Sequence, residues 1–170
     1  MSTPVKGSVI IADGNGRVTI IEPTSDNQVL CLDSTDPKGA VFKNISSIIP
    51  PQYFKISASD TKYTRSTNWD TILSVTVNGE SVNHIQEIKV LSFKDSSVDS
   101  YDIRVYDSTN NNVVASANFS NNDIEIMNLG TLSYLPTNSA IFEFQAKRNG
   151  GSGNSKNVYL LEVTLKYEIV

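Results

Sequence analysis

Few residues in this chain have side chains that commonly carry out catalysis, and none of them stands in a catalytic pattern. The 170 residues include one histidine, His84, and one cysteine, Cys31. His84 follows the turn-forming letters NGESVN, and no second histidine or nucleophile motif accompanies it. Cys31 lies in the apolar run QVLCLD, where we expect a small buried thiol. We therefore predict that the protein is not an enzyme and binds no cofactor and no metal ion.

Two glycine-rich segments resemble ligand-binding loops but lack the residues that such loops need. The letters ADGNGR, at residues 12–17, are not followed by the Lys-Ser/Thr pair of a phosphate-binding loop, so they predict a tight hairpin turn. The letters RNGGSGNSKN, at residues 148–157, lie between two alternating segments and predict a flexible loop at one end of a sandwich. Contact of this second loop with a ligand or partner stays open.

Acidic residues raise the question of calcium, but their spacing does not match a calcium-binding loop. Solvated loops and strand faces explain them, and a weak calcium site stays open. The residues concerned are Asp95, Asp99, Asp102, Asp107 and Asp123.

Two aromatic residues in a polar region suggest sugar binding. Tyr63 and Trp69 are close in the sequence, and Trp69 stands in the polar letters TRSTNWD. Flat aromatic rings stack on the apolar faces of sugars, so the pair could serve as a binding platform. The alternative is that Trp69 closes one end of the hydrophobic core.

Composition and charge narrow the function classes. The chain carries 14 Lys and Arg against 18 Asp and Glu, a net charge of −4, which provides no basic surface for nucleic acid. No segment approaches the run of about 20 apolar residues that crosses a membrane. The N-terminal letters MSTPVKGS contain no apolar run of the signal-peptide kind, so we expect synthesis in a cytosol.

These residues are positioned by short strands, because apolar and polar residues alternate in repeated bursts. In VYLLEVTLKYEIV the alternation predicts that Tyr159, Leu161, Val163 and the apolar residues after them share one face. The letters AIFEFQAK predict that Ala140, Phe142, Phe144 and Ala146 face inward, and SYDIRVYD and TILSVTVNG alternate in the same way. In IKVLSF the apolar phase jumps after Val90, which indicates a bulge or a strand covered on both faces. About eight strands between residue 52 and the C-terminus predict an all-β, antiparallel, jelly-roll-like β-sandwich.

The first fifty residues differ from the rest. Their apolar runs are shorter and bury too little surface to be stable alone, so they must find partners in the sandwich or in another chain. Pro50 and Pro51 interrupt any strand ladder, and we therefore predict a hairpin module at residues 1–49 and a sandwich at residues 50–170. The apolar residues expected to form an assembly interface, or else ordinary core, are Val9, Ile11, Val18, Ile20, Val29, Leu30, Val41 and Phe42.

Residues 7–45 resemble a repeat found in tail fibres of bacteriophages and in fibre-like or capsid-associated proteins of large DNA viruses. The repeat combines Asp-Gly, an apolar strand, Pro, Gly-Gln-Val-Leu, and Pro-x-Gly followed by an aromatic residue. The matching positions are Gly7, Ile10, Asp13, Gly14, Pro23, Gln28, Val29, Leu30, Asp33, Ser34, Pro37, Gly39 and Phe42. The chain departs from the pattern at Asn27, where glycine is usual, and at Phe42, where tryptophan is commoner.

The resemblance implies a non-enzymatic virion protein that serves as a fibre, spike, vertex or capsid-decorating component. In such proteins the repeat is an intertwined or docked module, often trimeric, ahead of a β-sandwich head. The expected partners are other copies of the chain or other virion proteins, and the sandwich would be displayed for host attachment. The alternative is a carbohydrate-binding module that uses Tyr63 and Trp69 on a host surface glycan. A sandwich hydrolase is a third possibility, without a nucleophile or metal motif to support it.

Overall fold

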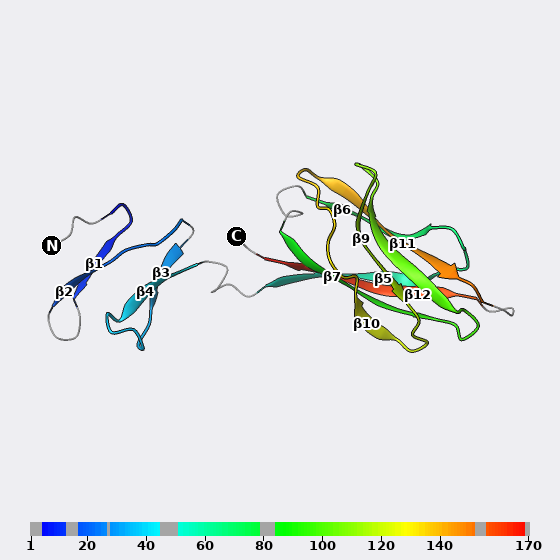
Figure 1. The fold of residues 1–170 in the computed structure, drawn as a ribbon, viewed down its shortest axis with the longest axis horizontal. Coiled ribbons are helices and arrows are strands. Elements are labelled where there is room, and N and C mark those ends of the chain that lie inside the picture. The colour runs from blue at the N-terminus through cyan, green and yellow to red at the C-terminus, as the bar shows by residue number, and fades with distance from the viewer. Residues whose placement is uncertain are drawn as a thin grey trace. The chain divides into compact units, whose positions relative to one another are not determined.

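The computed structural model describes residues 5–12, 17–26, 28–44, 51–78, 84–151 and 156–168, apart from the side chains of residues 58–61. In these ranges every regular element is a β-strand, which confirms the all-β prediction. The chain divides into two compact units that meet in the sequence at Pro51 and Gln52 (Figure 1).

The N-terminal unit contains two separate antiparallel hairpins. Strands β1 (Val9–Ala12) and β2 (Val18–Ile21) form the first, and β3 (Gln28–Leu32) and β4 (Ala40–Asn44) form the second. The predicted tight turn at residues 13–16 lies outside the described residues, but the pairing of Ala12 with Val18 confirms the hairpin around it.

The connection between β3 and β4 is shaped by its own polar side chains. The Asp33 carboxylate accepts hydrogen bonds from the Thr35 amide (3.0 Å) and hydroxyl (2.6 Å), as aspartate does at the start of a turn. Lys43 Nζ lies 3.1 Å from the same carboxylate. Gly39, with φ of 75°, then takes the left-handed conformation that leads the chain into β4.

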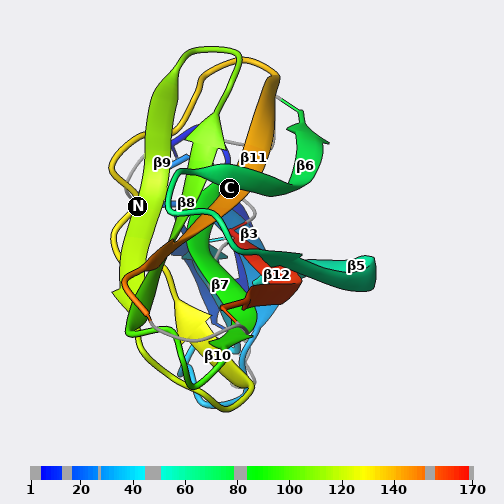
Figure 2. The same ribbon diagram turned by 90° about the vertical axis from the view of Figure 1, so that its right-hand side faces the viewer.

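The C-terminal unit contains eight strands in two four-stranded antiparallel sheets. The strands are β5 (Gln52–Thr64), β6 (Asp70–Val77), β7 (Ile85–Lys94), β8 (Ser100–Asp107), β9 (Asn112–Phe119), β10 (Glu125–Asn128), β11 (Ala140–Asn149) and β12 (Val158–Tyr167). One sheet has the order β10-β7-β12-β5 and the other β6-β11-β8-β9. Because the chain passes repeatedly from one sheet to the other, this is the predicted jelly-roll-like sandwich (Figure 2).

The core lies between the two sheets and follows the period of two in the sequence. Tyr101, Ile103 and Val105 of β8 are fully buried, and the residues between them are only partly buried. On β11 the predicted inward set of Ala140, Phe142, Phe144 and Ala146 is confirmed, because each is at most 2% exposed.

Strand β12 differs from the prediction because it contains a bulge. Its pairing with β7 passes from Leu160 to Glu162 while β7 advances by one residue, from Ser92 to Leu91, so Leu161 is an extra residue of β12 relative to β7. As a result Val158 and Leu160 are buried before the shift, and Val163 and Leu165 after it. The prediction that Tyr159 and Leu161 share the inward face was wrong, because alternation alone does not reveal an inserted residue.

Strand β7 explains the phase jump in IKVLSF without a bulge at that point. Its inward positions continue through Val90 to the buried polar residues Ser92 and Lys94, so Leu91 and Phe93 face outward. The Ser92 hydroxyl lies 3.0 Å from the Tyr101 hydroxyl, and Lys94 Nζ donates to Asn122 Oδ1 at 2.6 Å. The second interpretation holds, because Leu91 and Phe93 are themselves partly buried on the outer side.

Candidate functional site

The first hairpin carries apolar side chains on both of its faces. The pairing of Val9 with Ile21 and of Ile11 with Thr19 places Val9 and Ile11 on one face. Ile10, Ala12, Val18 and Ile20 form the opposite face, here called the exposed hairpin face. Ile10 is 61% exposed and Val18 is 67% exposed. The structure therefore divides the four predicted interface residues of this hairpin between two faces. It also exposes Ile10, which was not among the predicted interface residues.

The apolar side chains of the second hairpin are also partly exposed to solvent. Leu30 pairs with Phe42 on one face, and Val29 and Val41 lie on the other, beside Cys31. Val29 and Leu30 remain more than a third exposed, and Leu32 is 92% exposed. Cys31 is only partly buried, so the expectation of a buried thiol was wrong.

The described residues of the hairpin unit thus contain almost no core. Ile21 and Ala40 are the apolar residues that are buried there. Exposed apolar surface of this kind costs about 25 cal/mol for each Å² left in water, so it commonly marks a surface that another molecule covers.

Tyr63 and Trp69, predicted as one possible sugar platform, belong to two different aromatic groups. Tyr63, on β5, packs at 5.9 Å against Tyr159, which stacks on Phe93 at 4.3 Å. Trp69, just before β6, instead lies under the Arg104 guanidinium of β8, 4.3 Å from the ring centroid. Trp69 is absent from the buried core, so it does not close the end of the sandwich either.

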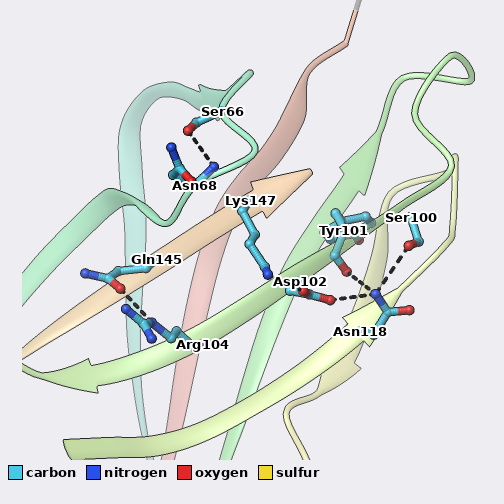
Figure 3. A network of polar contacts seen from close by, with 9 residues as sticks. All are labelled: Ser66, Asn68, Ser100, Tyr101, Asp102, Arg104, Asn118, Gln145 and Lys147. Carbon is cyan, nitrogen blue, oxygen red and sulfur yellow. Dashed lines mark hydrogen bonds and ion pairs between the residues drawn. The ribbon is translucent and has the colours of Figure 1, made fainter. Parts of the chain in front are cut away.

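Trp69 contacts, through Arg104 and Lys147, a polar network on the outer face of the β6-β11-β8-β9 sheet. Figure 3 shows Arg104, Gln145, Asp102 and Lys147 of this network. Arg104 Nε donates to Gln145 Oε1 at 2.7 Å, and Gln145 Nε2 donates to Glu143 Oε2 at 2.7 Å. The Thr71 hydroxyl also donates to Glu143, at 3.0 Å. These bonds join three neighbouring strands, because the register places Gln145 opposite Arg104 on one side and Thr71 on the other.

A second part of the network surrounds Asp102 of β8. Lys147 Nζ forms an ion pair with it at 3.2 Å and also lies 4.8 Å from the Trp69 ring centroid. Asn118 of β9 donates to Asp102 Oδ1 at 2.6 Å. Partial burial acts to raise the pKa of Asp102, but hydrogen bonds from Asn118, Asn149 and Lys147 outweigh it and leave the pKa below its usual value. Asp102 is thus a member of an ordered network as well as a residue of a solvated strand face.

The loop predicted at residues 148–157 is anchored at both of its described ends. Gly151 donates to the Asp99 carboxylate at 3.1 Å, and Asn157 donates to Asp95 Oδ2 at 2.9 Å. Arg148 Nε donates to the Arg65 carbonyl at 2.7 Å. Asp95 and Asp99 therefore bind the two described ends of this loop, and residues 152–155 lie outside the described part of the chain.

Other kinds of site find no support in the described ranges. There, no three His, Cys, Asp or Glu side chains lie together in a way that could hold a metal ion. Over the same ranges, no helix is long and apolar enough to cross a membrane.

The chain matches no protein-family model and no curated protein. Among solved structures it is similar to the VP2 subviral particle of infectious bursal disease virus, with 14% identity and a TM-score of 0.43 over 89% of this chain and 42% of that one. It is also similar to the T13 particle of the same virus, with 16% identity and a TM-score of 0.39 over 89% of this chain and 40% of that one. The chain thus spans about two fifths of those proteins, and its own strand order establishes the fold.

Proposed function

We propose that this protein is a non-enzymatic structural component of a virus particle that assembles through its N-terminal hairpin unit and displays the β-sandwich. The observation that carries the proposal is the missing core of the hairpin unit, whose exposed hairpin face presents Ile10 and Val18 to solvent. The similarity to virus particle proteins is too distant to add to this argument.

The strand edges and the exposed apolar side chains of the hairpins provide surfaces for assembly. Each hairpin has two strands of four or five residues, and among the described residues each strand forms a ladder only with its hairpin partner, so its outer edge can pair with another chain. Copies of one chain can cover such surfaces by symmetric association, which removes the apolar side chains and the strand edges from water together. The closed oligomer expected first is a trimer, located in a fibre, spike, vertex or capsid decoration.

Serine substitutions on the hairpin test this proposal. We expect the Ile10→Ser, Val18→Ser double variant to lose self-association, because both side chains lie on the exposed hairpin face. Sedimentation velocity over a range of protein concentrations measures the change. The matched control is Ile124→Ser, Ile126→Ser, which alters two isoleucines of the sandwich that are 58% and 65% exposed.

The control variant should associate like the unaltered chain. Equal loss of association in both double variants would indicate non-specific apolar contact. An unaltered chain that stays monomeric at all concentrations would contradict self-assembly and would leave only a different virion protein as the partner.

A further inference from the structure

The polar network contains two cations, Lys147 and Arg104. Arg104 is the one that forms no ion pair with a carboxylate of the described residues. The ion pairs among the described residues join Lys43 to Asp33, Lys55 to Glu162, Lys89 to Glu87 and Lys147 to Asp102, and none includes Arg104. Its hydrogen bond to a described residue runs from Nε to the neutral Gln145 amide. Glu143 accepts a hydrogen bond from that amide and forms no ion pair with Arg104, although its negative charge partly offsets the effect of burial on the pKa of Arg104. The two terminal nitrogens, which form the fork that binds carboxylates, are left for another acceptor.

The guanidinium is held in one orientation before any ligand arrives. It lies 4.3 Å from the Trp69 ring centroid and 4.8 Å from the Tyr106 ring centroid. The Tyr106 hydroxyl is itself fixed by a hydrogen bond to Asn111 at 3.1 Å. Partial burial lowers the pKa of Arg104, which reflects the solvation that the charged group has lost. A group fixed in this way loses little entropy when it binds an anion.

We propose that Arg104, with Trp69 and Tyr106, forms a site for the carboxylate of an acidic sugar on the outer face of the β6-β11-β8-β9 sheet. The carboxylate would accept hydrogen bonds from the terminal nitrogens of Arg104. The sugar body would lie beside the aromatic side chains, next to the guanidinium. Gln145 takes no direct part, because it is buried and its amide already bonds Arg104, Glu143 and Thr71. This inference does not depend on the assembly role of the hairpin unit.

The charges beside Arg104 favour a ligand with a single carboxylate. Glu143 and Asp102 flank Arg104 along the sheet, and their negative charges would repel further anionic groups. A polyanion such as nucleic acid or a run of acidic residues in a peptide meets this repulsion. An oligosaccharide that carries one carboxylate among neutral hydroxyl groups meets it only at the group that Arg104 binds, because its other groups carry no charge.

Trp69 provides a direct test, because the chain contains one tryptophan. Sialyllactose, neutral lactose and a glutamate-containing peptide are titrated into the full chain, and the Trp69 indole N–H and Arg104 Nε–H resonances are followed by NMR. We expect sialyllactose to shift both resonances in a saturable way and lactose to leave them unchanged. Arg104→Gln should weaken sialyllactose binding about tenfold or more, the loss expected for a charge-assisted, two-bond contact.

The matched control is Arg65→Gln, which removes the arginine that lies 5.6 Å from the Tyr63 ring centroid and leaves the proposed site intact. It should bind sialyllactose like the unaltered chain, and the dispersion of the amide spectrum shows whether each variant is folded. If Arg104→Gln does not fold, the single variants Trp69→Phe and Tyr106→Phe replace it. Their binding of sialyllactose is then followed by the backbone amide shifts of β8. Shifts caused by the peptide alone, shifts caused equally by lactose, or no shift with any probe would each overturn the proposal.

Discussion

The hairpin unit and the sandwich are both built from short apolar strands, but only the sandwich encloses them. Phe144 on β11 and Phe42 on β4 each belong to an apolar strand of an antiparallel sheet. Phe144 is fully buried because a second sheet covers it, and Phe42 is only partly buried. Strand pairing alone therefore does not form a hydrophobic core. A second layer is needed, and we propose that another molecule provides it for the hairpin unit.

The same contrast appears between the outer faces of the two sheets. The β6-β11-β8-β9 sheet is covered by a hydrogen-bonded network from Thr71 to Asn118, and its tryptophan lies beneath two cations. The β10-β7-β12-β5 sheet instead carries an aromatic row, in which Phe93 pairs with Tyr159 and Tyr159 with Tyr63. The outer surfaces thus differ in chemistry although the inner surfaces form one core.

The largest expected effect comes from the two phenylalanines of the comparison. Phe144→Ala should destabilise the sandwich by about 3–5 kcal/mol, because it leaves a cavity in a closely packed core. Phe42→Ala should change the same unfolding transition by less than about 0.5 kcal/mol, because it alters a partly exposed residue of the other unit. Denaturant unfolding of both variants, followed by near-ultraviolet circular dichroism, measures the difference. Similar losses of unfolding free energy in the two variants would contradict the difference in packing between Phe144 and Phe42.

A smaller effect separates two adjacent leucines of β12. Leu160→Ala should cost about 2–5 kcal/mol, because Leu160 is 2% exposed in the core. Leu161→Ala should cost less than about 1 kcal/mol, because Leu161 is the extra residue of the bulge and lies outside the core. Thermal unfolding of the two variants measures the order. The reverse order would show that β12 alternates without interruption and that the bulge is wrong.

The smallest expected effect concerns the turn between β3 and β4. Hydrogen bonds from the Thr35 hydroxyl and amide, together with Lys43, hold the pKa of Asp33 well below its usual value. Its carboxylate therefore stabilises the turn above the ordinary aspartate pKa of about 4, and this contribution is lost as pH falls through the lowered pKa. The Thr35 amide resonance should accordingly change only in strong acid.

Asp33→Asn is the control for this titration, because it removes the ionisable group and keeps the side-chain shape. The acid-dependent change at Thr35 should then disappear. A change centred near pH 4, about the ordinary aspartate value, would show that the turn does not hold the carboxylate.

Much of the sandwich could be predicted from alternation, because a period of two fixes which side chains share a face. The alternation of β8 and β11 led directly to the inward positions of Ile103 and Phe142. The inserted Leu161 could not be found in this way, because it is defined by the pairing of β12 with β7. The strand order was also beyond the sequence, because it depends on contacts between segments far apart in the chain.

The candidate sites show the same limit. Trp69 was recognised from its type, but its partners Arg104 and Lys147 lie 35 and 78 positions later in the sequence, and only sheet pairing brings them together. Ile10 was missed because its immediate neighbours are also apolar, so the sequence alone does not show which face stays exposed.

The most direct test of the account is the absolute mass, by light scattering after size exclusion, of the full chain and of a shortened chain that begins at Gln52. We expect a closed oligomer, most simply a trimer, for the full chain and a folded monomer for the shortened one. Two monomers, or an oligomer that survives the loss of the hairpin unit, would contradict the claim that this unit assembles the protein.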